Sequence, residues 1–163
     1  MILSIDEVVD RFADSIYRTA YSFLGSSCEA EDVVSDVLMK YFSLCSELEL
    51  ESTEHLKAWL LRTAINRCKD IAQSSRWKRS AELKDIHRTE FGWSEAEIDV
   101  RRALDRLPEK YRTVIYLYYY EEYKTEEISS ILSLPKGTVV SRLKRAREKL
   151  RDELADYGEE MSV

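Results

Sequence analysis

The chain has 163 residues, which fits one domain or two small ones. Only 4 Gly and 2 Pro beside 34% charged residues favour helices over sheets, so we expect an all-α protein. No apolar run approaches the ~18 residues that span a bilayer, and the first residues lack the pattern of a signal peptide, so we expect a cytoplasmic protein without membrane insertion. The spacing of the 3 Cys and 2 His matches no metal site or redox motif, and no cofactor is expected.

Charge is strongly segregated along the chain, although the formal net charge is only -6. Residues 1–56 hold 3 Lys or Arg against 12 Asp or Glu. Residues 57–90 reverse this with 9 against 4, and residues 136–151 hold 7 against 1. Two basic segments in an acidic chain indicate surfaces for a polyanion, separated from surfaces for another partner.

The N-terminal part begins with two predicted helices. Apolar residues at helical spacing predict a helix over 5–24 that stops at Gly25. Its predicted inward residues are Val8, Val9, Phe12, Ile16, Ala20 and Phe23. Ser26 with Glu29 three residues on predicts the cap of a second helix over 28–45. The outward face of that helix consists of Asp32, Ser35, Asp36 and Met39.

A longer helix is predicted over about 54–77, and it carries a polar stripe. The stripe recurs at i, i+4, i+7, i+11 and i+14, in Arg62, Asn66, Lys69, Gln73 and Arg76. Trp59 stands one turn before the stripe, at its edge. Because cations track a nucleic-acid backbone and aromatic rings stack on unpaired bases, this arrangement suits single-stranded or opened nucleic acid. A plain core role for Trp59 remains open.

Residues 78–96 show no sustained period, which predicts a linker with a domain boundary inside it. A short helix follows, with Val100, Ala103, Leu104 and Leu107 at helical spacing. Pro108 then opens another helix at a first-turn position. We predict its Tyr-rich stretch "YLYYY" as helical core, because the spacing of Tyr111, Val114, Ile115 and Tyr118 outweighs the strand propensity.

The last two predicted helices, 125–134 and 138–154, are joined through Pro135, Lys136 and Gly137 in the form of a helix-turn-helix. In the second of them, one stripe is apolar and docks: Val139, Leu143, Ala146 and Leu150. Ser141, Lys144 and Arg145 lie opposite, with Arg142 on the flank. Such a helix fits the major groove of duplex DNA, where Arg and Lys neutralise phosphates or donate to guanine.

Three stretches together resemble the small bacterial sigma factors of the extracytoplasmic-function (ECF) group, which direct RNA polymerase to promoters. They are "AEDVVSDVLMKYF" (30–42), "HLKAWLLRTAINRCKD" (55–70) and "LPEKYRTVIYLYYYEEYKTEEISSILSLPKGTVVSRLKRAREKLR" (107–151). The resemblance implies two small helical domains joined by a flexible linker and no catalysis, so the protein is not expected to be an enzyme. It divides the chain into an N-terminal sigma domain, a linker, a C-terminal helix-turn-helix domain and a tail, at 1–77, 78–96, 97–155 and 156–163.

The resemblance also implies three sets of contact residues. The clamp helices of core RNA polymerase would bind Asp32, Ser35, Asp36 and Met39. The -10 element of promoter DNA would be captured and opened by Trp59, Arg62, Asn66, Lys69, Gln73 and Arg76. The duplex -35 element would be read by Lys136, Thr138, Ser141, Arg142, Lys144 and Arg145, and this domain would also touch the polymerase flap. An anti-sigma factor stays open as a further partner.

The chain departs from the family pattern at three places. Val140 stands where family members often have Lys, and Pro135 stands where a capping Ser is frequent. The loop "CSELELESTEH", which in the family helps to select -10 bases, is strongly acidic here.

Two other classes of protein share some of these sequence features. A transcription regulator that binds duplex DNA through 97–155 shares the helix-turn-helix but leaves the polar stripe on the helix 54–77 unexplained. An enzyme would need the neighbouring carboxylates of Glu121, Glu122, Glu126 and Glu127. No nucleophile, phosphate-binding loop or metal-spaced His supports that reading.

Overall fold

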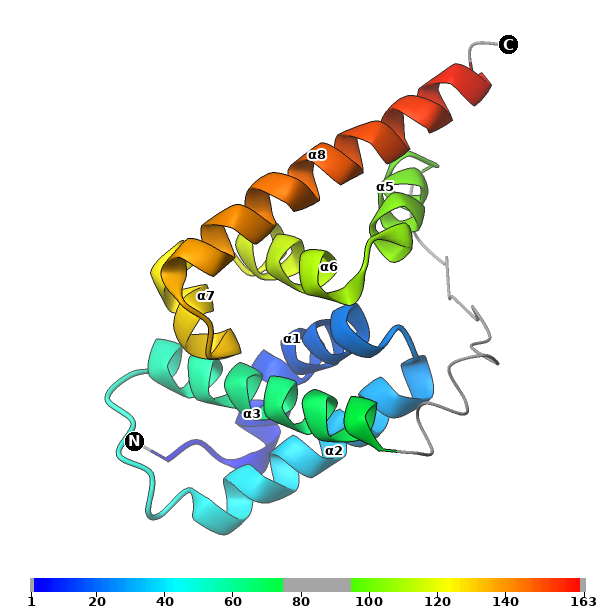
Figure 1. The fold of residues 1–163 in the computed structure, drawn as a ribbon. Coiled ribbons are helices and arrows are strands. Elements are labelled where there is room, and N and C mark those ends of the chain that lie inside the picture. The colour runs from blue at the N-terminus through cyan, green and yellow to red at the C-terminus, as the bar shows by residue number, and fades with distance from the viewer. Residues whose placement is uncertain (1, 75–94, 162–163) are drawn as a thin grey trace. The chain divides into compact units, whose positions relative to one another are not determined.

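A computed structural model describes residues 2–74 and 95–161 of the protein, with side chains described for 2–74 and 99–155. Every regular element in these ranges is a helix, so the all-α prediction is confirmed (Figure 1). None of the described helices combines the length and the apolar character that a membrane span needs. The described residues form two compact units.

The first unit is a bundle of three helices, α1 (Ile5–Leu24), α2 (Ser27–Leu44) and α3 (Thr53–Gln73), in which each helix packs against the other two. Side-chain caps fix where the helices begin. The Ser4 hydroxyl accepts from the Glu7 amide while the Glu7 carboxylate accepts from the Ser4 amide, and Ser26 accepts from the Glu29 amide as predicted. Gly25 ends α1 in the left-handed conformation with φ 68°, which confirms the predicted stop.

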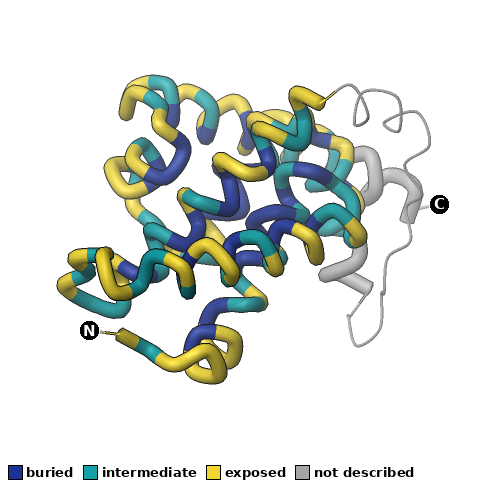
Figure 2. The backbone as a smooth tube through the Cα atoms, turned by 90° about the horizontal axis from the view of Figure 1, so that it is seen from below, coloured by how far each residue is buried: buried dark blue, intermediate teal, exposed yellow. Residues whose placement is uncertain are grey.

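The core of the first unit lies along the facing sides of its helices (Figure 2). It is built from Val8, Phe12, Ile16, Ala20, Leu24, Ala30, Val33, Val37, Tyr41, Leu56, Leu60, Leu61, Ala64, Ile65 and Cys68. The prediction that Val9 points inward is wrong, because it is 38% exposed. Val9 lies about 100° around α1 from the buried Val8, on a side of the helix that its neighbours leave partly exposed.

Helix α3 is shorter than the predicted helix 54–77, since it ends at Gln73. Ser74 is extended, with ψ 144°, and both its amide and its hydroxyl donate to the Ile71 carbonyl. A serine side chain that bonds to the preceding turn competes with continuation of the helix, which accounts for the early end. Arg76 and the predicted linker up to residue 94 lie outside the described residues.

The second unit contains α5 (Glu95–Arg106), α6 (Glu109–Ile115), η2 (Tyr116–Tyr120), most of α7 (Thr125–Leu132) and α8 (Lys136–Met161). Helix α8 packs along α5 and α6, and an ion pair of 3.3 Å joins Arg106 of α5 to Glu153 of α8. Its predicted apolar stripe is confirmed: Val139, Leu143 and Ala146 are buried, and Leu150 is half-buried.

The Tyr-rich segment differs from its predicted place in an α-helical core. Residues 116–120 form a π-helical turn, closed by the Glu121 amide on the Tyr116 carbonyl at 3.3 Å. The wider turn changes the direction of the side chains that follow it. Tyr116 and Leu117 remain buried, whereas Tyr119 and Tyr120 are each 52% exposed.

The turn between α7 and α8 centres on Ser133, and the prediction that Gly137 separates the two helices is wrong. Ser133 is left-handed, with φ 55°, and its amide donates to the Ser129 carbonyl. The Ser129 hydroxyl in turn donates to the Leu134 carbonyl. Gly137 is already the second residue of α8, because the helix begins at Lys136, two residues earlier than predicted. Bonds among Ser129, Ser133 and Leu134 therefore form the turn without a glycine.

Two isoleucines of α1 give a matched test of the first core. We expect Ile16→Ala to lower the free energy of unfolding by about 2–5 kcal/mol, because Ile16 is 0% exposed and its loss leaves a cavity. Ile5→Ala, at 56% exposure on the same helix, should change it by less than about 0.5 kcal/mol. Urea unfolding of both variants, followed by circular dichroism, checks this. Equal losses would show that α1 does not pack as described.

Candidate functional site

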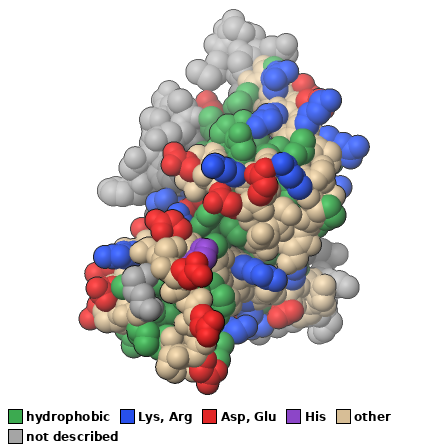
Figure 3. Space-filling model, turned by 90° about the vertical axis from the view of Figure 1, so that its left-hand side faces the viewer, with side chains coloured by type: hydrophobic (Ala, Val, Ile, Leu, Met, Phe, Trp, Pro, Cys, Tyr) green, Lys and Arg blue, Asp and Glu red, His purple; other side chains and the backbone are tan. Residues whose placement is uncertain are grey.

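Exposed side chains of the candidate site residues gather on α2, on α3 and on the helix-turn-helix. On the face seen in Figure 3, Lys and Arg side chains are dense in the upper right, and both acidic and basic side chains lie over the middle and lower parts.

The first surface, the α2 face, consists of Asp32, Ser35, Asp36 and Met39, as predicted for the outward side of this helix. Asp32 and Ser35 are exposed, Asp36 is half-buried, and Met39 is 65% exposed. Their i, i+3, i+4, i+7 spacing puts all of them on one side of α2. A flexible thioether flanked by carboxylates suits contact with a basic protein surface rather than with DNA.

Asp36 already has a partner within the chain. Its Oδ2 lies 2.7 Å from Nε of Arg67 on α3, and this hydrogen bond raises the pKa of the guanidinium. Sequence reasoning missed Arg67. The two residues lie 31 positions apart, and only the packing of α2 against α3 brings them together.

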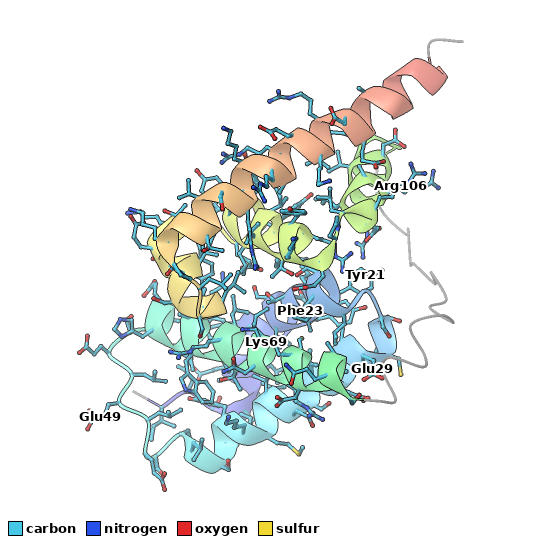
Figure 4. The ribbon with its side chains drawn as sticks, viewed as in Figure 1. Tyr21, Phe23, Glu29, Glu49, Lys69 and Arg106 are labelled. Atoms are coloured by element: carbon cyan, nitrogen blue, oxygen red, sulfur yellow. The ribbon has the colours of Figure 1, made fainter. Side chains whose placement is uncertain are left out.

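The second surface, the α3 stripe, consists of Arg62, Asn66, Lys69 and Gln73 among the described residues. Arg62, Asn66 and Gln73 are exposed, and Lys69, labelled on α3 in Figure 4, is half-buried. The predicted stripe is thus present on one helix as far as Gln73. The fifth predicted member, Arg76, lies outside the described residues.

Trp59 lies at the edge of the core of the first unit. It is half-buried, and its ring meets the ring of Tyr41 edge to face, with centroids 6.2 Å apart and planes at 60°. Tyr41 itself is only 1% exposed, so the indole rests on the core of the first unit. An aromatic ring held in this way keeps a fixed direction and loses little freedom when a base stacks on it.

The third surface is the exposed side of the helix-turn-helix. Lys136, Ser141, Lys144 and Arg145 are exposed, and Thr138 and Arg142 are half-buried. The Ser141 hydroxyl donates to the Thr138 carbonyl at 3.0 Å, so its proton is used within the helix. Val140 adds an apolar side chain that is 48% exposed.

Tyrosines of α6 and η2 hold several cations of α8. A hydrogen bond from Arg145 lowers the pKa of Tyr111, and Nζ of Lys110 and of Lys149 lie 5.0 and 5.8 Å from the centre of its ring. Arg147 donates from Nε to the Tyr119 hydroxyl at 2.7 Å. Fewer cations of α8 are therefore free of contacts within the chain than the number of Lys and Arg residues suggests. No spacing rule in the sequence identifies these pairs.

A salt bridge joins the first turns of α7 and α8. Nζ of Lys136 lies 2.6 Å from Oε1 of Glu126, and this hydrogen bond lowers the pKa of Glu126. Thr125 donates its hydroxyl to Oε2 of the same carboxylate at 3.3 Å. The candidate DNA contact Lys136 is thus paired with an acidic residue in the protein alone.

Two of the carboxylates that an enzyme would need have partners within the fold. Glu127 accepts from the Lys124 amide at 2.7 Å and caps α7, and Glu121 accepts from the Tyr116 hydroxyl at 2.6 Å. Within residues 2–74 and 99–155, no group of three His, Cys, Asp or Glu side chains could hold a metal ion. The described cysteines are free thiols.

Comparison with known proteins identifies both units. Residues 8–78 match the family described as Sigma-70 region 2, and residues 97–150 match the family described as Sigma-70, region 4. The chain is 29% identical to the ECF RNA polymerase sigma factor SigW of Bacillus subtilis, over 92% of this chain and 88% of that protein. It is 31% identical to the ECF RNA polymerase sigma factor SigE of Mycolicibacterium smegmatis, over 96% of this chain and 64% of that protein.

Solved structures agree with these relatives. The sigma factor RpoE of Bartonella quintana, in complex with the anti-sigma factor NepR, aligns with a TM-score of 0.72 and 26% identity, over 92% of this chain and 96% of that chain. CnrH, in complex with the cytosolic domain of CnrY, aligns at 24% identity with a TM-score of 0.66, over 93% of this chain and 88% of that chain, and supports the fold.

The matches cover both units in the order of the sequence. A regulator that only binds duplex DNA would leave the match over residues 8–78 unexplained. Sigma factors in general are not enzymes, which agrees with the structural roles of the carboxylates. The chain belongs to the ECF sigma factors, and its function is promoter-specific initiation of transcription with RNA polymerase.

Proposed function

We propose that this sigma factor divides its contacts among the three surfaces described above. The α2 face binds the clamp helices of core RNA polymerase, the α3 stripe with Trp59 captures the opened -10 strand, and the exposed side of α8 binds the -35 duplex. In terms of the chain, residues 1–77 carry the first two contacts and 97–155 the third. The observation that carries the proposal is the separation of an acidic α2 face from the cationic surfaces.

The α2 face suits a protein partner because it repels DNA. Asp32 and Asp36 place carboxylates beside the exposed Met39, so a phosphate backbone meets like charge there. A basic helix of a protein partner meets opposite charge and a flexible apolar side chain instead. Because the α2 face repels phosphates, DNA binds at the other two surfaces and not here.

The α3 stripe suits an unpaired strand. Arg62 and Lys69 supply positive charge along one side of the helix, and Asn66 and Gln73 supply donors and acceptors for base edges. Trp59, fixed against Tyr41, offers a ring for stacking at one end of this stripe. Charge along a backbone together with an aromatic platform is the general solution for single-stranded nucleic acid.

The start of α8 suits duplex DNA. In a helix-turn-helix the second helix enters the major groove, and residues near its N-terminus reach the bases. Lys144 and Arg145 are exposed there, and the half-buried Arg142 flanks them. Val140, 48% exposed, replaces a polar contact with an apolar one and suits a thymine methyl group.

We further propose that the protein acts in the cytoplasm and that an anti-sigma factor is among its partners. The related RpoE is in complex with the anti-sigma factor NepR. A protein that covers the α2 face would block polymerase without touching either DNA-binding surface. Run-off transcription with core polymerase, with and without this protein, tests the function as a whole, and the three variants below test the division of surfaces.

Charge reversal tests the α2 face. We expect Asp36→Lys to weaken binding to core polymerase about tenfold or more, because it replaces attraction by repulsion at the partner surface. Glu31→Lys makes the same charge change on the other flank of α2 and should have little effect. Binding of fluorescently labelled variants to core polymerase gives the measurement. If the two variants lose affinity equally, net charge and not the α2 face controls association.

Trp59 is the test of the -10 surface. We expect Trp59→Ala to reduce open-complex formation about 5- to 100-fold, because stacking on an aromatic side chain contributes about 1–3 kcal/mol per base. Trp59→Phe keeps a ring against Tyr41 and should retain much of the activity. Permanganate reactivity of promoter thymines in the holoenzyme reports the opened strand. If holoenzyme with Trp59→Ala opens the promoter as well as holoenzyme with the unchanged protein, Trp59 has only a core role.

Arg145 is the test of the -35 surface. We expect Arg145→Ala to weaken duplex binding about tenfold or more while core association stays unchanged, because a base or phosphate contact is lost. Tyr111→Phe is the control, since it removes the hydroxyl that bonds Arg145 but leaves the guanidinium in place. Binding of holoenzyme to promoter fragments measures the effect. If Arg145→Ala and Asp36→Lys lower both affinities alike, the division of surfaces is wrong.

A further inference from the structure

We propose that Glu126 restrains duplex binding by the free sigma factor, because its carboxylate holds the ammonium group of Lys136 and places a negative charge beside it. The inference rests on the proposed role of Lys136 as a DNA contact. Glu126 would weaken DNA binding at the surface where Lys136 and the other proposed contact residues strengthen it.

The geometry around Glu126 fixes both oxygens of its carboxylate. Oε1 lies 2.6 Å from Nζ of Lys136, and Oε2 accepts from the Thr125 hydroxyl at 3.3 Å. The side chains of Lys136 and Glu126 are 57% and 60% exposed, so the pair lies at the surface of the helix-turn-helix. A carboxylate oxygen on Nζ makes the bond that a phosphate oxygen of DNA would make.

The pair is not needed to hold the turn together. The turn is already closed by the Ser133 amide on Ser129, by the Leu134 amide on Ser129, and by the Val139 amide on Pro135. Helix α7 has its own cap, in which Glu127 accepts from the Lys124 amide. Exposed ion pairs in general contribute little to stability, so the main effect of this one is on the charge presented to a ligand.

The start of α8 is open to an approaching backbone. A Cβ built on Gly137, the residue after Lys136, would meet nothing within 4 Å. A phosphate that comes this close must displace Glu126 from Lys136 and also approach the freed carboxylate. The hydrogen bond from Lys136 lowers the pKa of Glu126, which means that the pair favours the charged carboxylate. Binding therefore loses part of what Lys136 would contribute alone.

Neutral variants of the full-length chain test the proposal. The probe is a fluorescent mixed-sequence duplex of about 30 base pairs, followed by anisotropy over a series of salt concentrations. We expect Glu126→Gln to bind about 3- to 10-fold more tightly at low salt, with a salt slope steeper by about 1, because Lys136 becomes free to displace a counterion. Glu126→Gln combined with Lys136→Gln should show a smaller gain over Lys136→Gln alone, because only the repulsion by the carboxylate is then removed and no ammonium group is released.

Asp152→Asn is the matched control for net charge. Asp152 is exposed on the same helix, 16 residues beyond Lys136, which is about 24 Å along α8. The two variants are compared at about 0.1 M salt, where the Debye length is only about 10 Å. Asp152→Asn should leave affinity and salt slope close to those of the unchanged protein. Thermal unfolding of each variant confirms that the helix-turn-helix is intact.

The outcomes separate the inference from the function on which it rests. If Lys136→Gln binds as well as the unchanged protein, Lys136 is not a DNA contact, and the proposed role of that residue falls together with the inference. If Lys136→Gln weakens binding but Glu126→Gln behaves like Asp152→Asn, the proposed function stands and the inference is overturned. Weaker binding by Glu126→Gln would also overturn it, because Glu126 would then support the DNA contact.

Discussion

The second unit depends on helix α8, which must bury one side and expose the other. Val139, Leu143 and Ala146 are almost fully buried and hold the helix against the rest of the unit. Burying a large apolar side chain stabilises the fold by about 1.5–3 kcal/mol. This gain outweighs the repulsion among the cations on the opposite side, which water and salt screen. Tyr111 and Tyr119 reduce that repulsion further, because they bind Arg145 and Arg147. The exposed cations can therefore be dense without loosening the helix.

Charge compensation within the chain recurs on both units. Asp36 of the α2 face is paired with Arg67, and Lys136 of the helix-turn-helix is paired with Glu126. Each pair joins two helices, and each sets a residue proposed for a macromolecular contact against an opposite charge. Partner binding then exchanges one ion pair for another instead of creating one from solvated groups. The net gain in affinity is then smaller than the attraction within the new pair, and binding depends on geometry more than on charge alone.

Much of the fold follows from the sequence because the deciding interactions are local. The helix starts at Ser4 and Ser26, the stop at Gly25 and the apolar stripe of α8 all depend on residues within one or two turns. The pairs Asp36–Arg67 and Glu126–Lys136 could not be predicted, since they require the relative placement of two helices. The end of α3 and the turn at Ser133 were missed because serine hydroxyls, and not glycine or proline, set them.

The π-helical turn has a consequence for how this sequence is aligned. Five residues from Tyr116 to Tyr120 occupy a turn in which backbone bonds run from i to i-5, so the phase of the apolar pattern slips by one residue there. A relative that kept an unbroken α-helix would need one residue fewer in this stretch to present the same faces before and after it. A single-residue gap among the tyrosines of an alignment would then reflect the π-helical turn and not a difference in function. Position-by-position transfer of residue roles across this point must take that shift into account.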